Sequence, residues 1–397
     1  MHPPDSRPTQ EPLRQVLETL RMGGPLTRAE LGRITGLSRT TVSGLLADLR
    51  RQGVVGDVLD RAAVPTGGRP AAWVALEARA GLAVGVDLGR THLRVAVADL
   101  GHRVLAEEVV RLDVDGHADE ALDAAVVQVD RLLAAAGGDR SLALGVGLGI
   151  PAPLDADGRV GSSNILPGWL GRSPGTDLQA RLGLPVEVEN DANLGALAEA
   201  LWGAGRDARL VVHVKAATGI GAGIVDGGRI FRGASGTAGE IGHTTVNEAG
   251  AVCRCGNRGC LELVAGGPAL VDQLRQSGVG VRGVADLVQR AKEGDLGCRR
   301  VLADAGEVMG LAVANLVNLL NPDVVVFGGE LGLADELVLG TLRLRVARSS
   351  LAAAASAVRI VPAQLGDRAE ALGGVLLVLR EPQRFGDDMP ARVSAAS

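Results

Sequence analysis

The sequence has no tyrosine, and its three tryptophans and three phenylalanines make up only 2% of its 397 residues. Aromatic platforms on which bases could stack are therefore scarce. Only four cysteines are present, and in a cytosolic chain of this length they argue for metal binding or chemistry rather than a disulfide framework. No apolar run is long enough to cross a bilayer, and the first residues lack the charged and then apolar layout of a secretory signal. We therefore expect a cytoplasmic protein with no membrane partner.

Length and charge predict a chain of several parts. A chain of 397 residues is expected to form two or three domains, and 46% apolar and 22% charged residues are ordinary for a soluble protein with buried cores. The net charge of −5 is uneven: residues 1–80 hold eleven arginines against eight acidic residues, a net charge of +3, whereas the remainder carries −8. A positive head on an acidic body permits contact with nucleic acid by the head alone.

A first helix is predicted to begin just after Thr27. Thr27 can cap that helix, and Glu30, three residues later, completes a capping box. Leu31 and Ile34 mark the apolar face that the helix would bury. Gly36 then breaks the helical pattern.

A second helix is predicted after Ser38, which can cap it, and Gly53 is expected to end it. Its apolar residues have the spacing of one buried helix face: Val42, Leu45, Leu46 and Leu49. The stretch that follows, 56–76, is typical of two short strands around a polar, glycine-rich tip.

This arrangement resembles the helix-turn-helix of winged DNA-binding domains. The resemblance implies that the first turns of the second helix enter the major groove, and that Arg69, at the wing tip, enters a neighbouring minor groove. Arg39 could pair with guanine, and the hydroxyl groups could contact phosphates or base edges. The predicted DNA-binding residues are Ser38, Arg39, Thr40, Thr41, Ser43 and Arg69. A helical hairpin that binds another protein is the alternative.

The rest of the chain, from residue 81 on, has a different sequence pattern, in which β-hairpins precede α/β segments. One hairpin is predicted within residues 81–105 and another within 210–233, each with glycines at its first turn. Two such units predict a duplicated, two-lobed α/β fold with a cleft, and ligands of such folds bind at the carboxyl ends of the strands. The glycines would let backbone amides approach phosphate, although a glycine at a hairpin tip is more often only a turn.

Three of the four cysteines lie in one short loop. Cys253, Cys255 and Cys260 follow the spacing C-x-C-x4-C, and His243 precedes them by ten residues. Three thiolates and one imidazole are a donor set for a closed, tetrahedral zinc site, and two glycines within the loop permit the tight turn that would wrap the ion. Buried free cysteines, or a redox pair, are the alternatives.

The body also carries the signatures GIPAP, ENDAN, TGIGAGI, AGEIGH, CRCGNRGCLE and NPDVVVFGG, in this order. On these signatures it resembles the ROK family, whose name joins repressors, open reading frames and kinases. The resemblance implies the actin-like, sugar-kinase ATPase fold, a duplicated ribonuclease H-like α/β architecture. With the head, it implies a winged helix-turn-helix domain over 1–80, an N-terminal lobe over 81–200, and a C-terminal lobe with the zinc loop over 201–397. The terminal helix is free to return to the first lobe.

The resemblance also assigns roles to the polar residues of the cleft. It implies a sugar site made of Asn190, Asp191, Glu240, His243 and Glu262. It implies that a structural Zn²⁺ is held by His243, Cys253, Cys255 and Cys260. In the family's kinases, the residue that matches Asp191 is the base that takes the proton from the attacking hydroxyl. If a nucleotide is bound, the matching residues are Asp87, Gly89, Thr91, Thr218, Gly219, Gly221, Gly328 and Gly329.

The first phosphate loop departs from the pattern of the family's kinases. They have a sequence close to D-x-G-G-T-K there, whereas this chain has DLGRTH at residues 87–92. Arg90 adds a long side chain where backbone should approach phosphate, although its charge could instead neutralise phosphate. Glu330, after the Gly-Gly turn, adds a negative charge near the expected nucleotide. We therefore expect a sugar sensor that has lost most kinase activity.

The favoured function is a sugar-responsive transcriptional regulator, a repressor of carbohydrate uptake or catabolic genes. Its expected partners are operator DNA, a small sugar and further copies of the chain in a homodimer or higher homo-oligomer. The alternative is a sugar kinase that uses ATP and Mg²⁺ and carries an accessory DNA-binding head. A third possibility is an interaction module that uses neither DNA nor sugar. Xylose, glucose and N-acetylglucosamine all stay open, because specificity depends on pocket shape.

Overall fold

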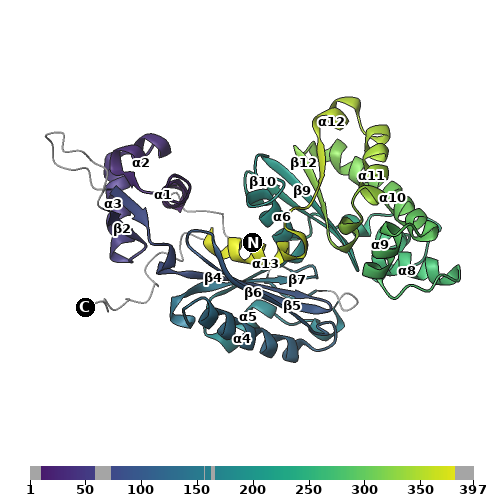
Figure 1. Cartoon of the computed structure of the whole chain (residues 1–397), viewed down its shortest axis with the longest axis horizontal. Coiled ribbons are helices and arrows are strands. Elements are labelled where there is room, and N and C mark those ends of the chain that lie inside the picture. The colour runs from purple at the N-terminus through teal and green to yellow at the C-terminus, as the bar shows by residue number, and fades with distance from the viewer. Residues whose placement is uncertain (1–9, 59–72, 156, 162–165, 381–397) are drawn as a thin grey trace.

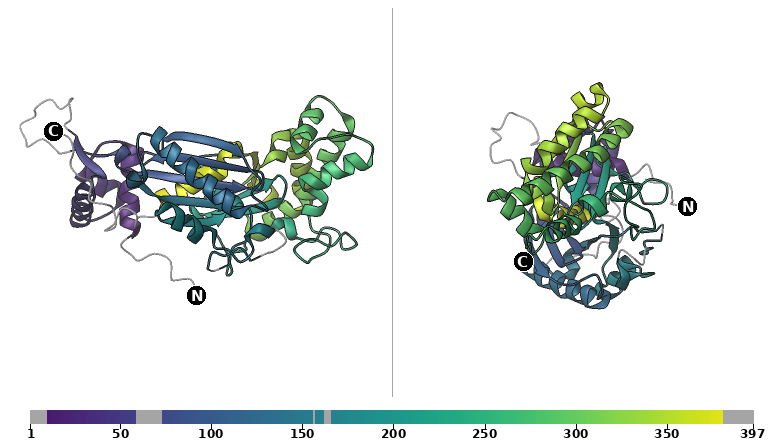
Figure 2. Two further views of the ribbon diagram at one scale, coloured as in Figure 1. Left: turned by 90° about the horizontal axis from the view of Figure 1, so that it is seen from below. Right: turned by 90° about the vertical axis from the view of Figure 1, so that its right-hand side faces the viewer.

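The computed structural model describes residues 10–58, 73–155, 157–161 and 166–380. A small head, purple in Figure 1, precedes two larger α/β lobes. The first lobe, in blue, lies between the head and the second lobe, in green (Figure 2). The last helix, in yellow, returns to the first lobe (Figure 1).

The head contains the predicted helices and strands, one additional helix and one additional short strand. Its elements are α1 (Gln10–Gly23), β1 (Leu26–Thr27), α2 (Arg28–Thr35), α3 (Arg39–Arg51), β2 (Val55–Val58) and β3 (Trp73–Leu76). The strands form an antiparallel sheet in the order β1-β3-β2, in which Val55 pairs with Leu76. β2 and β3 are the two predicted strands of the wing, whereas its tip, with Arg69, lies outside the described residues.

Local interactions fix both ends of α2. Thr27 Oγ1 accepts a hydrogen bond from the backbone N–H of Glu30 at 3.3 Å, and the Glu30 carboxylate accepts one from the N–H of Thr27 at 2.8 Å, which confirms the capping box. Gly36 ends the helix in the left-handed conformation, with φ of 71°. Leu31 is buried as predicted, but Ile34 is 51% exposed. The prediction for Ile34 is wrong, because the core of the head closes around Leu31 and leaves Ile34 in solvent.

The helix α1 is not among the predicted elements. Its buried Val16 and Leu20 share one apolar core with Leu31 of α2 and Leu46 of α3. The same core continues into the first lobe through Leu376 of the last helix. The head is therefore packed against the body by apolar contacts.

The first lobe is a five-stranded mixed sheet between two layers of helices. Its strand order is β6-β5-β4-β7-β8, with β4 antiparallel to β5 and parallel to β7. The strands are β4 (Leu82–Gly89), β5 (His92–Asp99), β6 (Val104–Arg111), β7 (Ala143–Ile150) and β8 (Val186–Asn190). The helices α4 (Ala118–Ala135) and α5 (Pro174–Leu182) cover one face, and α13 (Ala369–Leu379) lies on the other (Figure 1).

Glycines allow α13 to lie directly on the sheet. A β-carbon on Gly85 of β4 would stand 1.8 Å from the carbonyl oxygen of Ala371, and one on Gly147 of β7 would stand 2.1 Å from that of Gly374. A larger residue at either position would push the helix away. Helix α13 is thus held against the first strands of the body.

The second lobe repeats the hairpin-led pattern. Its sheet has the order β11-β10-β9-β12-β13, with β9 and β10 antiparallel and β12 parallel to β9. The strands are β9 (Leu210–Ala216), β10 (Ile220–Asp226), β11 (Arg229–Ile230), β12 (Val324–Gly328) and β13 (Arg359–Pro362). The helices are α7 (Glu262–Ala265), α8 (Gly267–Gln276), α9 (Val284–Lys292), α10 (Leu296–Leu320), α11 (Glu336–Ser349) and α12 (Ala352–Ala357). Between the lobes, α6 (Asp191–Leu201) packs on β9, β10 and α13.

The helix α10 is long and apolar enough, by length and composition, to cross a membrane. In this fold 56% of its most apolar window is buried, and residues such as Leu302, Met309 and Val313 lie in the core of the second lobe. It also packs against α7, α8, α9, α11 and α12. We therefore interpret α10 as a core helix.

Candidate metal centre and ligand cleft

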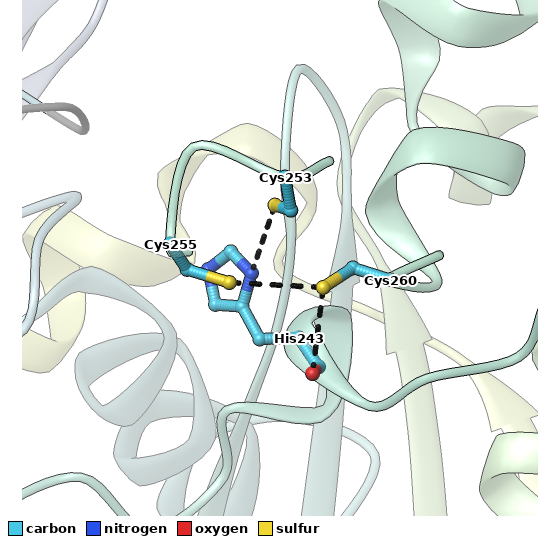
Figure 3. Close-up of side chains that lie close together, drawn as sticks. All are labelled: His243, Cys253, Cys255 and Cys260. Atoms are coloured by element: carbon cyan, nitrogen blue, oxygen red, sulfur yellow. Dashed lines mark hydrogen bonds between the residues drawn. The ribbon is translucent and has the colours of Figure 1, made fainter. Parts of the chain in front are cut away.

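A histidine and three cysteines of the second lobe face one common point. The ligand atoms of His243, Cys253, Cys255 and Cys260 all lie within 4.8 Å of one another, and Figure 3 shows the three sulfurs gathered around the imidazole. Nδ1 of His243 lies 3.7 Å from the Cys253 sulfur, and the sulfurs of Cys255 and Cys260 are also 3.7 Å apart. Four such donors around one point could hold a metal ion.

The backbone of this loop relies on glycine. Gly256 and Gly259 have φ of 94° and 65°, a region that favours glycine. A β-carbon on Gly259 would lie 1.6 Å from the carbonyl oxygen of Asn247, so only glycine fits there. Backbone pairing between Thr245 and Cys260 closes the loop. The structure confirms that these glycines permit the predicted tight turn.

The packed sulfurs favour a cation among them. Burial, with the neighbouring sulfurs of Cys255 and Cys253, raises the pKa of the Cys260 thiol to about 12. Burial also acts to raise the pKa of Cys255, but hydrogen bonds to the Asn257 backbone and to the other thiols outweigh it, and that pKa is lowered. Three sulfurs this close can all be thiolates only when a cation shares their charge. The donor set therefore fits a bound metal ion.

Glu262 connects this loop to the hairpin of β9 and β10. One of its carboxylate oxygens accepts a hydrogen bond from the backbone N–H of Ile220, and the other accepts one from Arg254, both at 3.1 Å. A β-carbon on Gly219 would lie 2.7 Å from the carboxylate. The position of Glu262 thus depends both on the cysteine loop, which carries Arg254, and on a glycine at the hairpin tip.

Glu240 precedes the short turn η4 (Ile241–His243). Its carboxylate lies 3.9 Å from Nε2 of His243, the ring nitrogen that does not contact the Cys253 sulfur. Burial, followed by the negative charges of Asp191 and Glu262, raises the pKa of Glu240 to about 7. The three carboxylates therefore share one acidic neighbourhood between the lobes.

Asn190 and Asp191 lie where β8 ends and α6 begins. Oδ1 of Asn190 caps α6 by accepting a hydrogen bond from the N–H of Ala192 at 2.9 Å, and its Nδ2 donates to the carbonyl of Ala152 at 3.3 Å. The chain itself therefore engages much of this amide. Asp191 is 8% exposed, and its Oδ2 accepts a hydrogen bond from Nζ of Lys215 at 2.7 Å.

Lys215 is a cleft residue that the sequence patterns do not predict. Its Nζ, which extends from β9, lies 2.7 Å from Asp191 and 2.8 Å from Glu370 of α13. Burial acts to lower the pKa of Lys215, but the charges of Asp191, Glu370 and Asp87 outweigh it and hold that pKa well above its ordinary value. One ammonium therefore joins the second lobe to α6 and α13. The carboxylate that a kinase would use as its base is already ion-paired.

The tip of the first hairpin is covered by a side chain. Nε2 of His92 lies 2.9 Å from Asp87 Oδ2, and the His92 ring stands 2.1 Å from where a β-carbon on Gly89 would be. Arg90 instead forms an ion pair with Asp115. The structure thus differs from the expectation that Arg90 occupies the phosphate position, because Asp115 draws the guanidinium aside and His92 covers the glycine.

The other residues matched to nucleotide binding lie at three turns. These are Thr91 at the exposed tip between β4 and β5, Thr218, Gly219 and Gly221 around the turn between β9 and β10, and Gly328 and Gly329 after β12. Gly329 has φ of 79°, and a β-carbon there would lie 2.4 Å from the carbonyl oxygen of Ala216. The turn after β12 therefore lies directly against the end of β9.

The start of α3 offers a polar surface. Ser38 caps the helix by accepting a hydrogen bond from the N–H of Thr41 at 3.1 Å, as predicted. The residues with predicted DNA contacts are all exposed: Ser38, Arg39, Thr40, Thr41 and Ser43. The opposite face is buried through Val42, Leu46 and Leu49, with Leu45 half-buried. Helix α3 therefore separates an apolar inner face from a polar outer one.

Comparison with known families agrees with this architecture. The model of the ROK family matches residues 83–381. The chain belongs to the ROK family. The model of the MarR family matches residues 14–70, which lie within the head. The expected fold, a winged helix-turn-helix followed by a two-lobed ROK domain, is confirmed.

Both transcriptional regulators and a kinase are similar to this chain. The "Xylose repressor" of Caldicellulosiruptor bescii is 30% identical over 93% of this chain and 96% of its own. The crystal structure of a ROK family transcriptional regulator, a homologue of the Escherichia coli MLC protein, is 26% identical, covers 95% of this chain and 97% of its own, and has a TM-score of 0.81. A ROK family glucokinase from Streptomyces griseus, solved with glucose and AMPPNP, is 30% identical, covers 75% of this chain and 99% of its own, and has a TM-score of 0.66.

Proposed function

We propose that the protein is a cytoplasmic, sugar-responsive transcriptional repressor of carbohydrate genes. The observation that carries the proposal is that one chain joins the exposed polar face of α3 to a cluster of carboxylates and an imidazole around Glu240. The xylose repressor is similar to this chain over nearly its whole length, head included. This similarity supports a head that binds DNA and a body that binds a sugar.

The proposed sugar site comprises Asn190, Asp191, Glu240, His243 and Glu262. Each hydroxyl of a neutral sugar both donates and accepts hydrogen bonds, so it suits a site that mixes carboxylates, an amide and an imidazole. Glu240 and Glu262 come from the second lobe, whereas Asp191 begins the helix between the lobes. A sugar that bridges these groups would favour the closed arrangement of the lobes.

Zinc is the ion that we propose for the Cys3His set. Sulfur ligands about 2.3 Å from a tetrahedral ion lie about 3.8 Å apart. The separation of 3.7 Å between the Cys255 and Cys260 sulfurs agrees with that value. If Nδ1 of His243 binds the ion, Nε2 stays free beside Glu240 to meet a hydroxyl. When bound, zinc would fix the conformation of the loop. Arg254 of this loop donates a hydrogen bond to Glu262, so the fixed loop would also hold Glu262 in place.

Release from DNA would follow from a difference in sugar affinity between two conformations. A ligand shifts an equilibrium only by its differential affinity for the two states. The head shares an apolar core with α13, and α13 carries Glu370, the partner of Lys215 in the cleft. If the two lobes move closer together, the movement can therefore reach the head through the side chains packed on α13.

The experiment that tests this function starts from a random DNA library. The purified protein is used to select a binding sequence, whose affinity is then measured with xylose, glucose or N-acetylglucosamine present. We expect one sugar to weaken operator binding by about 10-fold or more, the range of ordinary allosteric coupling. Failure to select any sequence, or equal affinity with every sugar, would contradict the proposal.

A sugar kinase is the second candidate, because Asp87 and Asp191 are both present and both act on Lys215. The ion pair of Lys215 with Asp191 and the cover of His92 over Gly89 oppose it. A coupled assay of ATP consumption with the same three sugars and Mg²⁺ separates the two candidates. Sugar-dependent turnover by the wild-type chain would favour the kinase.

Arg39→Ala is expected to reduce the preference for operator over random DNA by about 10- to 100-fold, if Arg39 reads a base. The measurement is competitive binding at fixed salt. Arg51→Ala is the matched control, since Arg51 ends the same helix, is 74% exposed and carries the same charge. If both variants lose the preference for operator DNA equally, Arg39 contributes only general electrostatic attraction to DNA.

We expect the protein to be at least a dimer on its operator. One head offers few base contacts, and helix-turn-helix proteins gain affinity by reading two half-sites about one helical turn, or a multiple, apart. Light scattering of the complex with operator DNA measures the mass. A complex that contains a single chain would contradict this expectation.

A further inference from the structure

A polar cavity lies where the head meets the first lobe. Helix α1 contributes Arg14, Glu18 and Arg21, the turn between β5 and β6 contributes His102, and the end of α13 contributes Arg380. Leucines from α1, β3, β5–β6 and α13 form the apolar part of its wall. Head and body therefore build this cavity together, at a distance from the cysteine loop and the cleft.

Two of the arginines lack a partner in the described part of the chain. Neither the Arg21 nor the Arg380 side chain forms a hydrogen bond or an ion pair with a described residue, and Nε of Arg21 is buried. Burial lowers the pKa of both guanidinium groups, and the charge of Glu18 opposes this effect only in part. Partly buried cations that no hydrogen bond or ion pair compensates are costly, so this position favours a bound anion.

His102 adds a neutral donor to the same cavity. Its backbone has φ of 65°, unusual for a residue other than glycine, and its Nδ1 accepts a hydrogen bond from Nε1 of Trp202 at 3.2 Å. Because indole N–H can only donate, the neutral ring must carry its hydrogen on Nε2. Burial, with the charges of Arg21 and Arg380, lowers the pKa of His102 to about 3, so the ring is neutral.

The remaining charges leave the cavity cationic. Arg14 is engaged by Glu11 at 2.6 Å, and Glu11 also lies 3.6 Å from Arg229. Glu18 is the one carboxylate among the described lining residues, and it acts on both Arg21 and Arg380, while Glu11 also acts on Arg380. Guanidinium groups with free N–H donors are the preferred protein ligands of phosphate groups.

We propose that this cavity binds the phosphate group of a small anion, inorganic phosphate or a phosphomonoester, and that occupancy changes the affinity of the head for DNA. The cavity volume of about 40 Å³ suits one compact group rather than a whole sugar. A phosphate there would bridge Arg21 of the head and Arg380 of the body. It would thereby favour the docked arrangement of α1 on α13. The coupling rests on the proposed function, whereas the binding does not.

Binding is tested with inorganic phosphate and with glucose 6-phosphate, using calorimetry on the full chain. We expect saturable binding of both, weakened at least about 10-fold in Arg21→Gln and in Arg380→Gln. Arg131→Gln, on the outer surface of α4, is the control and should bind like the wild type. Thermal unfolding without phosphate checks that each variant is folded. Absence of saturable binding near 1 mM, on the order expected for a weak specific site, or equal binding by all variants, would overturn the proposal.

Two further variants test whether the anion binds in this cavity and whether the chain supplies its own counter-ion. Cys255→Ser should keep its affinity for inorganic phosphate; loss of binding in that variant but not in Arg380→Gln would place the anion in the cleft and overturn the proposal. Glu381, which lies outside the described residues, could itself be the counter-ion. If the wild type does not bind phosphate and Glu381→Gln binds it, the chain's own carboxylate fills the cavity, and the proposal is again overturned.

The coupling is measured by operator binding with and without saturating phosphate at constant ionic strength. We expect an affinity change of about 5-fold or more in the wild type, the lower range of allosteric coupling, and none in Arg380→Gln. If phosphate binds saturably but operator affinity does not change, the proposed effect on DNA binding is overturned, whereas the proposed phosphate site stands. Failure to bind any operator would instead count against the proposed function.

Discussion

Lys215→Met is expected to lower the free energy of unfolding by about 3–5 kcal/mol, because it leaves Asp191 and Glu370 buried without a cation. The two carboxylates are 8% and 5% exposed, and Asp87 adds a third negative charge beside them. The measurement is urea-induced unfolding at pH 7.5. A loss below about 1 kcal/mol, the value of an exposed ion pair, would show that water screens this cluster.

The double variant Lys215→Met/Glu370→Gln is the matched control. It removes a negative charge together with the positive one, so it should recover a substantial part of the lost stability. The pH dependence gives a second criterion. Burial, with the charges of Asp87 and Asp191, raises the pKa of Glu370, and the Lys215 ammonium opposes this effect. Its removal therefore raises that pKa further, and a raised carboxyl pKa favours folding only while the group is protonated. Lys215→Met should therefore regain stability as the pH falls from 7.5 towards 5, and the double variant should change less.

Cys255→Ser is expected to abolish metal binding and, with it, the response to sugar. Loss of one ligand of four removes most of the binding free energy, so metal content should fall from about one ion per chain to near zero. The freed loop would no longer hold Arg254 against Glu262, and we expect sugar affinity to fall about 100-fold or more. Operator binding without sugar should persist if the repressing form is the open one, because the head lies at the opposite end of the molecule (Figure 1).

Elemental analysis and operator binding with and without sugar measure these effects. Cys298→Ser is the control, since Cys298 is fully buried in α10 and lies outside the metal cluster. It should retain the ion and the sugar response. A metal-free Cys255→Ser protein that still leaves DNA normally when sugar is added would refute the proposed role of the ion.

Features set by neighbouring residues were predictable from the sequence. The capping box of Thr27 and Glu30 and the helix end at Gly36 depend on contacts within a few residues. The cysteine cluster is compact in the sequence and requires only a turn to assemble. The helix α1, although absent from the predicted elements, was also predictable, since its apolar residues have helical spacing: Leu13, Val16, Leu17 and Leu20.

Features that depend on distant partners were not predictable. Lys215 meets Asp191 and Glu370 only because α6 and α13 both cross between the lobes. Arg90 turns to Asp115, and no local pattern links these two residues. Ile34 has the spacing of a buried residue, but periodicity does not say which face of a helix receives a partner.

The return of α13 to the first lobe has a consequence for biosynthesis. Its glycine-mediated contacts with β4 and β7 are made by residues that follow both strands and the whole second lobe in the sequence. A growing polypeptide therefore exposes one apolar face of its first sheet until residues 369–379 have been synthesised. The head shares its core with α13, so an unfinished chain lacks the surface on which the head docks. Prematurely terminated chains would thus carry a DNA-binding domain without the body that regulates it.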